Sequence, residues 1–182
     1  VYQGAYMLLL ARLRGRSEVT LGVTRSGRSG ARLGIERAVG LYISTLPIRR
    51  NISLGEDLAE WLRELQQEQA RQEEHGHLSL SDIKSSAGCL SGESLFETLF
   101  VYENYPINAE AAQIASNIEI ENIQGRDATH YSLLLSVLPG SLTKLRFTYD
   151  GLKLDRAMVE TVGQSLTHVI EAISSSRENT YV

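Results

Sequence analysis

An almost uninterrupted apolar run, Leu41–Ile48, is the feature of this sequence that most constrains its fold. Side chains of a strand point alternately to the two faces of its sheet, so a run that is apolar at nearly every position predicts a strand buried on both faces. With 182 residues, the chain is long enough to bury such a sheet within one domain. The run therefore predicts a sheet with covering layers on both sides.

Segments with helical and with strand periodicity alternate along the rest of the chain. An apolar stripe predicts a first helix that ends near Gly15, and Ser53 with Glu56 predicts a capping box for a second helix that buries Trp61. Further predicted elements are strands over 19–23, 95–106, 131–138 and 142–149, a short helix over 80–85, and a last helix that begins near Asp155. The last two strands are expected to pair antiparallel across a Pro-Gly-Ser turn. This order predicts an α/β fold, a mixed-sheet α/β sandwich.

Composition limits the function classes. A formal net charge of −4, with 42% hydrophobic and 22% charged residues, is typical of a globular protein and argues against nucleic-acid binding. The longest apolar runs, such as Met7–Ala11 and Leu133–Leu138, are too short to cross a bilayer, so no membrane contact is expected. The single cysteine, Cys89, excludes an internal disulfide and fits a reducing, cytoplasmic location. Residues 1–50 hold nine arginines against two glutamates, a balance of +7 that either attracts an anionic partner or is surface chemistry without one.

The glycine-rich stretch over residues 22–34 has the composition of a phosphate-binding loop but not its sequence. A P-loop places a lysine and a serine or threonine at the start of a helix, whereas Arg28 and Ser29 are followed by more loop and a strand. No helix opens on the last glycine, as a dinucleotide-binding loop requires. A nucleotide site is therefore not predicted.

The residues that most often carry catalysis form no set in this sequence. His75 and His77 could bind a metal as a pair, but no cysteine or carboxylate cluster completes a ligand set, and a solvated helix end is the favoured interpretation. His130 and His168 have no evident partner, and Cys89 lies in a loop without a catalytic motif. The sequence predicts neither a catalytic residue nor a metal site.

Three blocks of the sequence stand out: "GVTRSGR" (Gly22–Arg28), "VGLYISTLPIRR" (Val39–Arg50) and "LFETLFVYENYP" (Leu95–Pro106). Together they resemble the C-terminal half of a condensation domain of nonribosomal peptide synthetases, and they follow the order of that family. Ser44 stands where the family usually has asparagine, and the family's catalytic motif, His-His-x-x-x-Asp-Gly, is absent from this sequence. Because that motif belongs to the N-terminal half, we expect residues 1–182 to be the C-terminal subdomain of a longer domain, truncated on its N-terminal side.

The resemblance implies one lobe of a chloramphenicol-acetyltransferase-like fold, in which two similar lobes form a V around an active-site tunnel. In that family, carrier domains deliver phosphopantetheine-tethered substrates, and the acceptor amine attacks the donor thioester to form an amide. The second histidine of the absent motif is thought to orient or deprotonate the amine. The resemblance thus implies that this chain supplies tunnel wall and floor, binds no cofactor directly and is inactive by itself.

The implied site residues lie in the three blocks. The residues implied for the tunnel and its floor loop are Ser26, Gly27, Arg28, Ser44, Thr45, Glu103, Asn104 and Tyr105. A structural role is the alternative for each: a turn-stabilising hydroxyl at Ser26, satisfied polar groups in a strand over 44–45, and a strand-end turn over 103–105. Arg28 and Arg32 are implied contacts of the pantetheine phosphate or of an acidic carrier surface.

Residues 107–123 resemble the family's latch, which crosses to the other lobe. Their segment "NIEIENI" alternates isoleucine with polar residues, which predicts a half-exposed edge strand and, in a detached lobe, a route to a dimer. The implied partners are the N-terminal lobe, donor and acceptor peptidyl carrier domains and a neighbouring adenylation domain. The alternative hypothesis is a non-catalytic module of the same fold that binds a carrier or neighbouring domain. Epimerisation and heterocyclisation domains fit the third block less well because it ends in "ENYP".

Overall fold

The computed structural model describes residues 1–28, 39–53, 55–90, 92–104 and 129–175. Within these ranges the chain forms α1 (Tyr2–Arg14), β1 (Glu18–Arg25), β2 (Ser44–Asn51), α2 (Leu58–Glu73), α3 (Leu80–Ser86), β3 (Thr98–Tyr102), β4 (Leu133–Leu138), β5 (Lys144–Tyr149) and α5 (Arg156–Ser175). The expected latch over 107–123, with its "NIEIENI" strand, lies outside the described residues. Over those ranges, no helix combines the length and the hydropathy needed to span a membrane.

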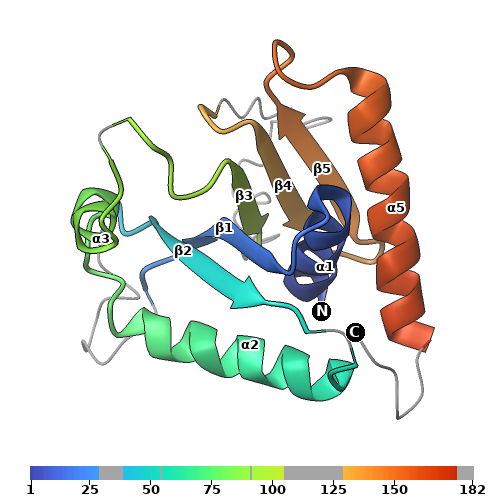
Figure 1. Cartoon of the computed structure of the whole chain (residues 1–182), viewed down its shortest axis with the longest axis horizontal. Helices are drawn as coiled ribbons and strands as arrows, with labels where there is room; N and C mark the ends of the chain where they lie inside the picture. The colour runs from blue at the N-terminus through green and yellow to red at the C-terminus, as the bar shows by residue number, and fades with distance from the viewer. Residues whose placement is uncertain (29–38, 54, 91, 105–128, 176–182) are drawn as a thin grey trace, which may run out of the picture.

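The strands form one five-stranded mixed sheet in the order β2-β1-β3-β4-β5. β1, β3 and β4 run parallel, whereas β2 and β5 pair antiparallel with their inner neighbours. Figure 1 shows α1 and α5 side by side across one face of the sheet and α2 alongside β2. The predicted mixed-sheet α/β sandwich is confirmed.

The predicted first helix is confirmed, and the capping of the second is corrected. α1 ends at Gly15, which takes the left-handed conformation (φ 59°) that a residue with a Cβ adopts only at a cost. The N-cap of α2 is Asp57, whose carboxylate accepts a hydrogen bond from the backbone N–H of Glu60 at 2.8 Å. The capping box predicted at Ser53 and Glu56 is therefore wrong, because the helix begins one turn later than that motif requires.

The prediction that Leu41–Ile48 is a strand buried on both faces is also wrong. β2 begins only at Ser44, and it is an edge strand of the described sheet. Leu46 and Ile48 are buried, whereas Leu41 is 88% exposed. The strand that is buried along almost its whole length is β4, which has a neighbour on each side and apolar layers on both faces.

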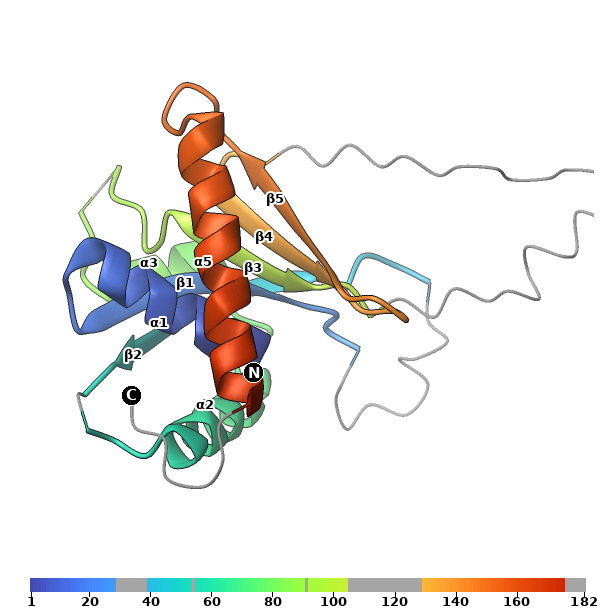
Figure 2. The ribbon, with the colours of Figure 1, turned by 90° about the vertical axis from the view of Figure 1, so that its right-hand side faces the viewer.

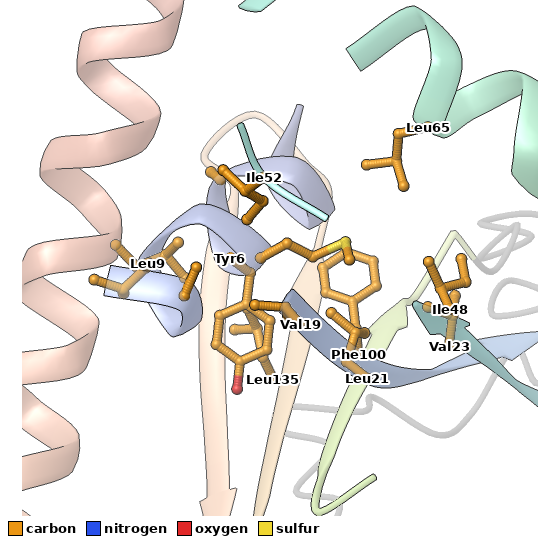
Figure 3. Packing of buried hydrophobic residues seen from close by; sticks show 14 of the residues in the cluster. Tyr6, Leu9, Val19, Leu21, Val23, Ile48, Ile52, Leu65, Phe100 and Leu135 are labelled. Atoms are coloured by element: carbon orange, nitrogen blue, oxygen red, sulfur yellow. The ribbon is translucent and has the colours of Figure 1, made fainter. Parts of the chain in front are cut away.

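The larger hydrophobic core lies between the sheet and the helices α1, α2 and α5. Figure 3 shows how Tyr6 of α1 packs among Val19 and Leu21 of β1, Phe100 of β3 and Leu135 of β4. Each such apolar side chain stabilises the fold by roughly 1.5–3 kcal/mol on burial. Burial also raises the pKa of the Tyr6 phenol.

A smaller cluster covers the opposite face of the sheet. Phe96, Leu99 and Leu134 are buried there, with Leu80 of α3 and Tyr131 packed against them. The rings of Phe96 and Tyr131 stack with centroids 5.1 Å apart. This face is therefore covered by side chains and a short helix, whereas the other face carries three longer helices.

Two arginines join the β1–β2 hairpin to α2. The guanidinium of Arg25 lies 2.8 Å from the carboxylate of Glu73, and its side chain is only 13% exposed. Arg50 reaches the carboxylates of Glu64 at 2.9 Å and Glu68 at 3.3 Å. These ion pairs hold α2 against β1 and β2, the strands that carry the first two sequence blocks.

Candidate functional site at the carboxyl edge of the sheet

The three sequence blocks meet at one edge of the sheet. Because β1, β3 and β4 are parallel, their carboxyl ends lie at the same edge, and β2 and β5 begin there because they run antiparallel to their neighbours. In Figure 2 this edge lies on the right, where β3 ends and β5 starts. We call it the carboxyl edge. Polar residues at adjacent strand ends are brought together by this topology, as they are in other parallel sheets.

The strand register aligns the candidate residues across β2, β1 and β3. Arg25, the last residue of β1, is the partner of Ser44, the first residue of β2. The β1–β3 register, continued past its last paired residues, places Ser26 level with Glu103. Ser44, Ser26 and Glu103 thus lie at adjacent strand ends of the carboxyl edge.

Ser44 and Thr45 lie on opposite faces of β2, since successive residues of a strand alternate. The partner of Ser44 is Arg25, which bonds to Glu73 of α2, so Ser44 belongs to the helix-covered face. Thr45 pairs with Thr24 on the other face. The two hydroxyls therefore cannot line one continuous surface of the sheet.

Ser26 is exposed immediately after β1. Its Oγ accepts a hydrogen bond from the backbone N–H of Arg28 at 3.4 Å, which is the geometry of a turn-stabilising hydroxyl. One lone pair and the hydroxyl proton of Ser26 remain for another group. The structural role and the expected tunnel role of Ser26 are thus compatible.

Glu103 and Asn104 continue the chain directly beyond β3. The N–H of Glu103 donates to the carbonyl of Val137 at 2.9 Å and extends the β3–β4 ladder, while the N–H of Asn104 donates to the carbonyl of Tyr102 at 3.1 Å. Glu103 is half-buried and Asn104 is exposed. Tyr105 and Arg32, the other predicted site residues, lie outside the described residues.

The positive charge of the first fifty residues is spread over the molecule. Arg25, Arg49 and Arg50 pair with glutamates, and Arg28 donates to the carbonyl of Gly40. The arginines at the end of α1, which precedes β1 and so lies at the opposite edge, are exposed: Arg12, Arg14 and Arg16. Charge alone therefore does not mark the carboxyl edge.

An exposed apolar rim at the carboxyl edge was missed from the sequence. Val39 is 101%, Leu41 88% and Ile43 50% exposed, and Tyr102 and Leu142 add exposed apolar surface at the ends of neighbouring strands. The sequence carries a signal in the alternation of Val39, Leu41 and Ile43 with the residues between them, but this alternation does not say which set is exposed. The rim is suited to contact with another apolar surface.

A groove of about 510 Å³ lies between the edge strand β5 and α5. Its floor is Leu145, Phe147 and Tyr149, and the side chains of Arg156 and Glu160 line its helical wall. The groove lies outside the three blocks.

The two histidines considered for a metal do not form a site. His77 Nδ1 lies 3.2 Å from the carbonyl of Glu74, in the exposed turn after α2. Within the ranges that the structure covers, no three His, Cys, Asp or Glu side chains are placed to hold a metal ion.

The mixed sheet, its order and its helices define an α/β sandwich of the chloramphenicol-acetyltransferase-like class. The family model described as "Condensation domain" matches residues 1–180, and the chain belongs to this condensation-domain family. Chondramide synthase cmdD of Chondromyces crocatus is 38% identical over 159 residues, which cover 87% of this chain and 4% of that protein. Vanchrobactin synthetase VabF of Vibrio anguillarum is 35% identical over 166 residues, which cover 90% of this chain and 6% of that protein.

Solved structures show the same fold. A mutant of the starter condensation domain of the rhizomide synthetase RzmA matches with a TM-score of 0.70 at 17% identity, over 99% of this chain and 43% of that chain. AB3403, a four-domain nonribosomal peptide synthetase bound to AMP and glycine, matches with a TM-score of 0.79 at 14% identity, over 97% of this chain and 15% of that chain. This chain thus spans less than half of each solved chain and a small part of each synthetase.

Proposed function

We propose that this chain is the C-terminal lobe of a condensation domain that forms an amide between a carrier-tethered donor thioester and a carrier-tethered acceptor amine. The observation that carries the proposal is that Thr45 of β2, Ser26 just beyond β1 and Glu103 just beyond β3 come by register to the same face of the sheet at the carboxyl edge. These residues come from the three different blocks. Such a convergence of polar groups is expected of a surface that lines a substrate tunnel.

In this proposal the lobe positions substrates and does not transfer protons to or from the amine. Thr45, Ser26 and Glu103 offer hydroxyl and carboxylate groups for hydrogen bonds to tethered substrates. Gly27 brings backbone close to the site, and Asn104 and Tyr105 continue the wall beyond β3. The general base would come from the histidine motif of the N-terminal lobe, so the isolated chain is expected to be inactive.

The proposed partners follow from the same role. The N-terminal lobe would pack against the exposed rim of Val39, Leu41 and Ile43, and the latch over 107–123 would cross to it. Peptidyl carrier domains would deliver substrates on phosphopantetheine, next to an adenylation domain of one cytoplasmic synthetase. A contact of Arg28 or Arg32 with the pantetheine phosphate is a separate hypothesis that the proposed function does not require, and a carrier-binding titration that is unchanged on removing both side chains would contradict it.

The test compares this chain with a longer protein, which contains the residues that its gene encodes upstream and ends at residue 182. Both would be given donor and acceptor thioesters on carrier domains, and the amide product would be measured by mass spectrometry. We expect product from the longer protein, none from the chain alone, and none after either histidine of the upstream motif is changed to alanine. A longer protein that binds carriers but forms no amide would favour the second candidate, a non-catalytic docking module.

A further inference from the structure

Arg28 and Tyr42 hold the end of β1 against the segment that leads into β2. The guanidinium carbon of Arg28 lies 4.7 Å from the centroid of the Tyr42 ring, within the range of a cation–π interaction. The same guanidinium donates a hydrogen bond to the carbonyl of Gly40 at 3.3 Å. The Arg28 side chain thus contacts both the Tyr42 ring and the Gly40 carbonyl in the segment that leads into β2. We call these two contacts the clasp.

Gly27 allows the end of β1 and the segment before β2 to approach each other closely. It takes a left-handed conformation (φ 61°), and a Cβ added to it would lie 1.9 Å from the carbonyl oxygen of Tyr42. Only glycine therefore fits, for two independent reasons. The contact also fixes the backbone of Tyr42 beside Gly27, so the ring of Tyr42 is available to Arg28.

The clasp acts on the candidate site through the backbone. Arg28 lies two residues after Ser26 and its backbone N–H donates to the Ser26 Oγ at 3.4 Å, so a displacement of Arg28 is passed on to that hydroxyl. Tyr42 precedes Ser44 and Thr45 on the other arm. A link between residues 28 and 42 therefore adds to the β1–β2 pairing in holding the Ser26 hydroxyl relative to Thr45.

We propose that Arg28 is a positioning residue, whose guanidinium lies over the Tyr42 ring and thereby fixes Ser26 relative to Thr45 at the carboxyl edge. The guanidinium is required because its spread N–H groups let it lie over the ring and donate to Gly40 at the same time, whereas a lysine ammonium keeps the charge as a single point. The effect on amide formation rests on the function proposed above. The clasp itself does not.

The first arm of the test measures amide hydrogen exchange along the 182-residue chain. The variants are R28K, which keeps the charge, Y42L, which removes the ring, Y42F, which keeps it, and the double variant R28K/Y42L. We expect about tenfold faster exchange at residues 24–25 and 44–45 in R28K and in Y42L, no further increase in the double variant, and wild-type exchange in Y42F. Exchange at β4 and β5 should stay at the wild-type rate. This control excludes a general loss of stability, which would accelerate exchange there too.

Three results would overturn the clasp. They are wild-type exchange in R28K, equal acceleration at β4 and β5 in R28K and Y42L, and effects of the two single variants that multiply in the double variant. Residues that act through one shared contact show non-additive effects, whereas independent residues show additive free energies.

The second arm measures amide formation by the longer protein described above. Positioning predicts that R28K and Y42L each lower kcat about tenfold, with little change in KM for the acceptor carrier, and that Y42F retains activity. A phosphate contact instead predicts that R28K is active, that R28Q raises KM, and that Y42L has no effect, and this pattern would overturn the positioning role. If wild-type protein forms no amide, the proposed function fails, while the exchange arm still decides whether the clasp exists.

Discussion

The ring of Phe96 occupies the space directly over Gly22. A Cβ added at residue 22 would lie 2.2 Å from Cε2 of the ring and 2.6 Å from its Cζ. Gly22 is in β1 and Phe96 precedes β3, so this contact seals the smaller core where the two parallel strands meet. Packing against Phe96 therefore requires a glycine at position 22.

Replacing Gly22 by alanine should therefore destabilise the chain by about 1–3 kcal/mol, the usual cost of overpacking. The free energy of unfolding would be measured in urea, with the fluorescence of Trp61, the single tryptophan, as the signal. G151A is the matched control, because a Cβ at Gly151 meets nothing within 4 Å. In G22A/F96L the smaller side chain should recover part of the loss. Equal stabilities of G22A and G151A would show that Phe96 does not hold this position.

Arg50 should contribute more to stability than its neighbour Arg49. Arg50 is 18% exposed, bonds to two glutamates of α2 and lies with its guanidinium carbon 6.0 Å from the centroid of Trp61. We expect R50A to cost about 1–2 kcal/mol, less than a fully buried pair because Glu64 is half exposed.

Tryptophan emission provides a second signal for the same variant. In R50A the emission of Trp61 should shift to longer wavelength as α2 loosens from β2. R49A is the control, since Arg49 and Glu18 are 70% and 53% exposed and their pair should contribute little. A larger loss of stability in R49A than in R50A would contradict the assignment.

Glu97 should make stability fall on acidification. The hydroxyl of Ser132 donates to its carboxylate at 2.9 Å, and with the nearby Lys153 ammonium this lowers the pKa of Glu97 below its ordinary value. A carboxyl whose pKa is lowered in the folded state stabilises the fold fully above its ordinary pKa, and this stabilisation is lost as the pH falls through the folded-state value. Urea unfolding of E97Q should show a weaker pH dependence than wild type between about pH 5 and pH 3. An unchanged slope would mean that other carboxyl groups carry the acid sensitivity.

The assignment of Asp57 as the N-cap of α2 can be tested by comparing its loss with the loss of the Ser53 side chain. Asp57 caps the helix through its side chain, whereas Ser53 contributes its backbone carbonyl to this turn, which accepts from the N–H of Glu56 at 3.4 Å. D57A should cost about 1 kcal/mol, the usual cost of losing an N-cap, and S53A should be near neutral. Thermal unfolding monitored by circular dichroism would measure both. A larger cost for S53A would restore the capping box that the sequence predicted.

Local signals made much of the fold predictable. α5 has a clear apolar stripe, Gly15 ends the apolar helix α1, and the β4–β5 pair is joined by a short turn. The order of the strands was not accessible in this way. β1 lies between β2 and β3 because of contacts between residues far apart in the sequence, and the edge position of β2 follows from that order. The exposure of Leu41 therefore could not be derived from its apolar neighbours.

The candidate site was predictable only as far as the resemblance of the three blocks extended. That Ser26 and Glu103 are level depends on the β1–β3 register, and the opposite faces of Ser44 and Thr45 depend on where β2 begins. The stacking of Arg28 on Tyr42 joins residues on either side of a long connection. No periodicity in the sequence reports such a contact.

The position of β1 also has a consequence for synthesis on the ribosome. β1 and β2 can form a hairpin early, but the second edge of β1 stays open until β3 has emerged, and the sheet closes only after β4 and β5. Pairings between such distant segments slow folding, and an open strand edge is a template for aggregation. Expression of this chain should therefore depend on elongation speed and on chaperones that shield the hairpin.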